Sequence, residues 1–167
     1  MNPPLKFPDA EAMRRPVRSP MARWVGFLLG EQHYALPIVQ VHEVFARIDI
    51  EPVPQSGPFV RGVTNVRGRI VTVLDLHHRL GVVGGPREEG SMIVAEVNGE
   101  PVAFQVDRIT SLHSVAADAI KPAPAVCRDQ LDPAVCGLIH GEHGLVTLLG
   151  MPGLLAGISP QLTDSAA

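Results

Sequence analysis

The sequence predicts an all-β protein built from two similar small barrels, and three observations lead to this fold class. The segment Val60–Leu80 recurs in degraded form at Val135–Leu155, as a Val-x-Gly motif, a turn and a Val-Thr-x-Leu strand. The strand Tyr34–Ile38 is echoed by Val102–Val106. Short Val-rich and Ile-rich runs are separated by turns at regular spacing, which favours small barrels over a parallel α/β sheet. A repeated β unit predicts two related subdomains with a seam between them.

The composition supports this interpretation and excludes several function classes. The chain has 167 residues, of which 46% are hydrophobic but only 4% aromatic, so its core must be built from Val, Ile, Leu and Ala. The net charge of -3 argues against a phosphate-binding surface, and scarce aromatics leave few platforms for stacking bases. We find no apolar run long enough to cross a membrane and no apolar signal segment, so we expect a cytoplasmic protein with Cys127 and Cys136 reduced.

The first half of the chain begins with a predicted flexible tail at residues 1–21, which contains Pro and Arg but few periodic apolar positions. A hairpin is expected from Trp24 to Ile38, followed by a strand over Val39–Phe45. After a proline-rich crossing, Ile70–Leu74 is apolar on both faces, which predicts a strand covered on each side. A short helix should follow, with Asp75 as its N-cap and Gly81 at its end.

The second half is expected to repeat this order after a Gly-rich, charged loop at residues 82–91. Its strongest signal is Asn98-Gly99, the dipeptide most typical of a tight hairpin turn. The remaining predicted elements are strands at Met92–Val97, Pro101–Val106, Ile109–Val115, Val135–Ile139 and Leu145–Leu149, and a short helix at Pro152–Leu155. We therefore expect a domain over 22–156, with subdomains at about 26–81 and 91–156 that are intertwined, and a C-terminal tail at 157–167.

Taken together, these segments resemble the CheW family of chemotaxis coupling proteins over about residues 23–156. The matching pieces are WVGFLLGEQHYALPIVQVHEV, FVRGVTNVRGRIVTVLDLHHRLG, VNGEPVAFQVDRI, IKPAP and GLVTLLGMPGLL. The resemblance implies two five-stranded SH3-like barrels packed with an apolar groove between them. It also implies an adaptor without catalysis or a cofactor, which binds the regulatory domain of a CheA-type histidine kinase and the cytoplasmic tip of a chemoreceptor. The same binding logic could serve another chemosensory-type pathway, such as pilus motility or development.

The resemblance also implies which residues face partners. Glu43 occupies the family's acidic position, Arg67 its arginine in the Asn-x-Arg-Gly turn, and the other matched positions are Val41, Gly62, Asn65 and Ile109. Gly68, which permits the turn, and the apolar strand residue Leu112 complete the predicted partner-binding set. Because Gly68 allows a tight turn, Arg67 should project from the strand end, where a guanidinium can bind a carboxylate. We therefore hypothesise that Arg67 pairs with Glu43, and that the apolar seam receives a receptor helix.

Other chemistries are set aside on the residue patterns. His140 and His143 share a predicted turn, but no third ligand follows at a fitting spacing, so a metal site is not expected. Nucleotide-binding and nucleophile motifs are lacking, and nothing marks Asp75 and Asp107 as an acid–base couple. From a different class, the seam could serve as the pocket of a small-ligand-binding double barrel, although such pockets usually need aromatic walls.

Overall fold

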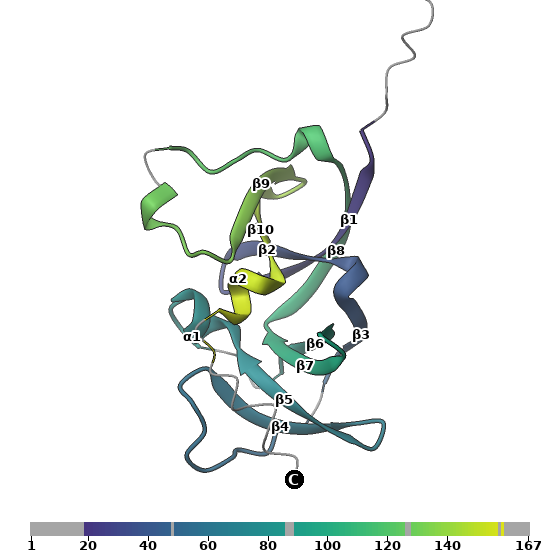
Figure 1. Ribbon diagram of the computed structural model, residues 1–167, viewed down its shortest axis with the longest axis vertical. Helices are drawn as coiled ribbons and strands as arrows, with labels where there is room; N and C mark the ends of the chain where they lie inside the picture. The colour runs from purple at the N-terminus through teal and green to yellow at the C-terminus, as the bar shows by residue number, and fades with distance from the viewer. Residues whose placement is uncertain (1–18, 48, 86–88, 126–127, 157, 159–167) are drawn as a thin grey trace, which may run out of the picture.

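The computed structural model describes residues 19–47, 49–85, 89–125, 128–156 and 158, and strands predominate over these ranges (Figure 1). In these described ranges, ten strands form two five-stranded sheets, each arranged antiparallel except for one parallel pair. Sheet A has the order β8 (Arg108–Ala116), β1 (Met21–Leu29), β2 (Gln32–Pro37), β10 (Gly144–Leu149) and β9 (Val135–Gly141). Sheet B has the order β3 (Val41–Phe45), β6 (Ser91–Val97), β7 (Glu100–Val106), β5 (Arg69–Asp75) and β4 (Val60–Val66). The all-β class with two five-stranded SH3-like subdomains is thus confirmed.

Five short helical segments accompany the sheets in the described ranges. They are η1 (Ile38–Gln40), α1 (Leu76–Leu80), η2 (Ala117–Ala119), η3 (Arg128–Gln130) and α2 (Met151–Leu155). The predicted caps of α1 are confirmed: the Asp75 carboxylate accepts the His78 N–H, and Gly81 adopts the left-handed conformation at φ 66°. The expected strand over Val39–Phe45 begins only at Val41, because residues 38–40 turn the chain from one sheet into the other.

The two sheets do not follow the predicted subdomain limits at 26–81 and 91–156. The first half contributes β1 and β2 to sheet A but β3, β4 and β5 to sheet B, and the second half does the reverse. The crossings occur at η1 and at Asp107, and the parallel pairs β2–β10 and β5–β7 join the exchanged pieces. Each sheet is therefore a hairpin from one half completed by three strands from the other. The predicted tails lie largely outside the described residues.

The repeat is visible in the register of the strands. In sheet A, Phe27 pairs with Ile109, while in sheet B Ala95, the counterpart of Phe27, pairs with Val41. A strand irregularity adjoins each of these pairs. The β4–β5 and β9–β10 hairpins correspond in the same way, since each joins two antiparallel strands through a tight turn. Every strand of the first half thus has a structural counterpart in the second.

The seam between the sheets is apolar, as the sequence predicts, but buried side chains fill it in the described ranges, and the receptor helix expected there stays a prediction. One buried cluster joins residues of both sheets, including Phe27 and Leu36 of sheet A and Leu74 and Phe104 of sheet B, all at most 1% exposed. Smaller clusters lie within sheet A, around Trp24 and Leu148, and within sheet B. Because the largest cluster is shared, the two sheets should stabilise one another.

Polar contacts also cross between the sheets. The buried Arg79 guanidinium of α1 donates to the carbonyls of Leu154 and Gly153 in α2, at 2.9 and 2.8 Å, and forms an ion pair with Asp132. At the second crossing, the Asp107 carboxylate accepts the Gly30 N–H and lies 3.1 Å from Nε2 of His77. Figure 1 shows α1 and α2 between the two lobes that the sheets form.

Candidate partner-binding surface

The turn between β4 and β5 is built to hold an arginine outward. Val66 and Arg69 pair across it, which leaves Arg67 and Gly68 as a two-residue loop with φ angles of 51° and 83°. Positive φ at both positions is the signature of the type I′ hairpin turn. The Asn65 side chain accepts the Gly68 N–H at 2.8 Å and braces the turn. An arginine in the left-handed region costs roughly 1 kcal/mol, so the fold tolerates local strain at this tip.

The predicted pair between Arg67 and Glu43 is confirmed. Nε of Arg67 lies 2.6 Å from Oε1 of Glu43, which joins the tip of the β4–β5 hairpin to edge strand β3. The arginine side chain is 76% exposed and the glutamate 30%. An exposed pair of this kind contributes about 0–1 kcal/mol to stability. Both charged groups therefore remain accessible to a partner at little cost to the fold.

Gly62 allows a close backbone contact that holds the β4–β5 hairpin in place. It is buried in β4 at φ 153°, and a Cβ there would lie 2.2 Å from the carbonyl oxygen of Glu51. The Glu51 backbone exchanges two 2.8 Å hydrogen bonds with Val63, so this close approach ties the crossing segment to the hairpin. Gly62 thus acts through the backbone and offers no side chain to a partner.

The predicted apolar positions separate into two kinds. Val41 and Ile109 are counterparts in the repeat, and both are half-buried against the central cluster. Leu112 is 47% exposed on β8 of sheet A. Glu43, Asn65, Arg67 and Gly68 therefore meet at one end of sheet B, whereas Ile109 and Leu112 lie on the other sheet.

Ile70 is an exposed apolar residue at this surface that the sequence analysis did not predict. The sequence predicts Ile70 within a strand covered on both faces, yet its side chain is 68% exposed. It directly follows Arg69 after the turn and pairs with Asn65, at the strand end where no layer covers the outer face. Proximity to an Arg-Gly turn is the only signal that could have indicated this. An exposed branched side chain beside an ion pair is typical of a contact surface.

Three further expectations from the sequence concern metal binding, the two cysteines and membrane-spanning segments. In the described ranges, no three His, Cys, Asp or Glu side chains are arranged to hold a metal ion. Cys136 is a free thiol whose pKa is raised by burial, and Cys127 lies outside the described residues. Over the part of the chain that is described, no helix has the length and apolar character to cross a membrane.

Comparison with known proteins identifies relatives over nearly the whole fold. The family model described as CheW-like domain matches residues 23–159. Chemotaxis protein CheW of Thermotoga maritima is 39% identical over 135 residues, which cover 81% of this chain and 88% of that protein. Protein PilI of Pseudomonas aeruginosa is 27% identical over 120 residues, or 71% of this chain and 67% of that protein. The crystal structure of scaffolding protein TtCheW from Thermoanaerobacter tengcongensis superposes with a TM-score of 0.71 at 28% identity, covering 81% of this chain and 92% of that one.

Proposed function

The chain belongs to the CheW-like domain family, and we propose from this premise that it is a chemotaxis coupling and scaffold protein. CheW-family proteins are scaffold and adaptor proteins. The observation that carries the proposal is the family match over residues 23–159, which includes both sheets and both crossings between them. A relative that shared only one hairpin unit would support the fold alone.

In this role the protein links the cytoplasmic tips of chemoreceptors to a CheA-type histidine kinase, in the cytoplasm and without catalysis of its own. We assign partner binding to the end of sheet B, where Glu43, Arg67 and Ile70 combine opposite charges with an exposed apolar side chain. A partner carboxylate can compete for Arg67 in a two-pronged bond, because the existing pair is weak. Val41, Gly62, Asn65 and Gly68 support this surface, whereas the predicted positions Ile109 and Leu112 lie apart from it on sheet A.

Titration calorimetry against the regulatory domain of the kinase from the same organism tests this assignment. We expect micromolar binding that Arg67→Ala weakens about tenfold, the effect of losing one charge-assisted contact of about 1.4 kcal/mol. Arg23→Ala is the matched control, because it removes an exposed arginine from sheet A and should leave binding unchanged. Equal binding by both variants would move the interface elsewhere, and no binding at all would contradict the coupling role.

An adaptor role in a pilus-type chemosensory pathway is the second candidate, favoured by the match to PilI. The match to the Thermotoga maritima CheW is more extensive and more nearly identical, and it favours the chemotaxis role. Deletion of the gene distinguishes the two: loss of chemotactic swimming supports the first role, and loss of pilus-driven motility with intact chemotaxis supports the second.

A further inference from the structure

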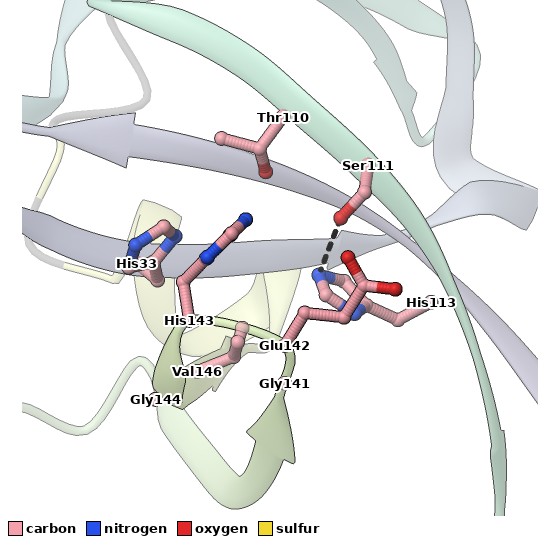
Figure 2. Close-up of a pocket in the computed structure, with 9 residues that line it drawn as sticks. All are labelled: His33, Thr110, Ser111, His113, Gly141, Glu142, His143, Gly144 and Val146. Carbon is pink, nitrogen blue, oxygen red and sulfur yellow. Dashed lines mark hydrogen bonds between the residues drawn. The ribbon is translucent and has the colours of Figure 1, made fainter.

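Histidines from three separate segments line a small cavity at the end of sheet A (Figure 2). His33 comes from β2, His113 from β8 and His143 from the β9–β10 turn, which also contributes the Glu142 carboxylate. The cavity volume is about 20 Å³, which is room for a single water molecule. The cavity therefore has one imidazole on β2, one on β8 and one on the turn.

The rings are close enough to influence one another. His33 and His143 stack with their centroids 6.2 Å apart, and Nε2 of His113 lies 3.3 Å from Oγ of Ser111. Figure 2 shows the Glu142 side chain directed toward His113 and Ser111, with the His143 ring on the His33 side. A carboxylate and three imidazoles thus share one small space.

An apolar cluster backs this group. Val146 lines the cavity and belongs to the cluster within sheet A, and Trp24 of the same cluster pairs with His113 across β1 and β8. The pKa of His113 is lowered from its ordinary value of 6.5, chiefly by burial and then by His33, with Glu142 opposing the shift. The closed arrangement therefore favours neutral His113.

The corresponding end of sheet B has no imidazole at these three positions. By the register of the repeat, Phe45 corresponds to His113, Pro101 to His33 and Gly68 to His143. Phe45, together with Val66, packs against the apolar cluster of sheet B. The three histidines are therefore a feature of one end of the molecule and not a requirement of the fold.

We propose that the end of sheet A is a proton-sensitive switch, in which charging of His113 releases the β9–β10 turn from β2 and β8. Protonation of His113 puts a positive charge at the mouth of an apolar cluster, with Glu142 as the carboxylate that faces it. From β1, the residues against His113 are Trp24 and Gly26, which carry no charge. From β2 and the turn, they are His33, Glu142 and His143.

The sign of the effect follows from linkage. Because the closed state lowers the pKa of His113, an open turn binds more protons than a closed one. The closed turn is fully favoured above about pH 6.5 and is progressively lost as the pH falls from there toward the lowered pKa. The switch therefore opens on acidification, in the range where an imidazole titrates.

Amide hydrogen exchange of the full chain at pH 7.5 and pH 5.5, corrected for intrinsic exchange rates, tests the switch. Opening of residues 141–144 should increase at pH 5.5, up to about tenfold for each unit by which closure lowers the pKa. The turn at Arg67 and Gly68, which has no imidazole at the corresponding positions, should keep the same protection at both pH values. Unchanged protection of residues 141–144 in the wild type would overturn the proposal.

Matched variants locate the effect. His113→Phe, which copies the counterpart Phe45, should abolish the pH response, whereas His140→Asn, on the same hairpin but outside the cavity lining, should retain it. The reciprocal Phe45→His should make the β4–β5 turn acid-sensitive, and it serves if His113→Phe does not fold. A pH response that survives in His113→Phe, or that is lost in His140→Asn, would overturn the assignment to this cavity.

Discussion

The two barrel ends that the repeat makes equivalent have acquired different chemistry. At the end of sheet B, Arg67 in a strained turn pairs with Glu43, and the apolar Phe45 packs below. At the end of sheet A, Glu142 occupies the position of Arg67 and His113 that of Phe45, and a small cavity remains. One backbone plan thus carries a charged, exposed surface at one end and a titratable cluster at the other. The difference teaches that the two ends share a backbone plan and differ in the side chains that their turns and the adjoining strands present.

The largest expected effect comes from the apolar cluster that the two sheets share. Leu36 and Phe104 are counterparts, each fully buried in the cluster between the sheets. Leu36→Ala and Phe104→Ala should each lower the free energy of unfolding by about 3–5 kcal/mol, through lost burial and a residual cavity. Denaturation followed by probes in both sheets should remain a single transition. If either variant melted one sheet while the other stayed folded, the shared core would not couple them.

The next largest difference in stability is expected between substitution of the buried Arg79 and substitution of the exposed Arg67. Arg79 is 8% exposed and binds Asp132 and two carbonyls of the opposite helix, so Arg79→Ala should cost about 3 kcal/mol by stranding buried acceptors. Arg67→Ala should cost less than about 1 kcal/mol. Urea unfolding of both variants measures the difference. Similar losses would show that the Arg67 pair is part of the fold and not a surface feature.

A smaller difference in stability is expected for Gly62 and Gly137, which occupy equivalent positions in the two halves of the repeat. A Cβ at Gly62 would lie 2.2 Å from the backbone oxygen of Glu51, whereas one at Gly137 would lie 2.5 Å from a side-chain atom, the Cγ2 methyl of Ile120, which can shift more readily than backbone. Gly62→Ala should therefore destabilise by about 2–3 kcal/mol and Gly137→Ala by about 1 kcal/mol, as expected for rigid and yielding overpacking. Thermal unfolding of the two variants checks the order. A greater loss at Gly137 would contradict the structural role assigned to Gly62.

Much of this fold could be predicted from sequence because it depends on local signals. The repeat, the Asn98-Gly99 hairpin and the Asp75 cap all lie in short segments whose residue types have strong conformational preferences. The sequence predicts that the two halves are intertwined, but it does not predict which strands they exchange. Similar segments show which strands are alike, but the parallel pairs β2–β10 and β5–β7 arise from long-range packing that no local pattern records.

Some residues of the two candidate sites could be predicted from the sequence, and others could not. Arg67 and Glu43 could be predicted because both lie in segments that match a known family. His33, His113 and His143 come from distant parts of the chain, and neither periodicity nor spacing indicates that folding brings them together. Ile70 departs from its prediction because an apolar residue in a strand is usually buried, and only the end position of β5 exposes it.

The central claim is that the end of sheet B, and not its counterpart in sheet A, binds the partner. Titration calorimetry at pH 7.5 of Arg67→Ala and Glu142→Ala against the kinase regulatory domain tests it most directly, because the two residues occupy equivalent turn positions. We predict that Arg67→Ala weakens binding about tenfold, or about 1.4 kcal/mol, while Glu142→Ala binds as the wild type does. Equal affinities for the two variants, or a loss confined to Glu142→Ala, would contradict the account.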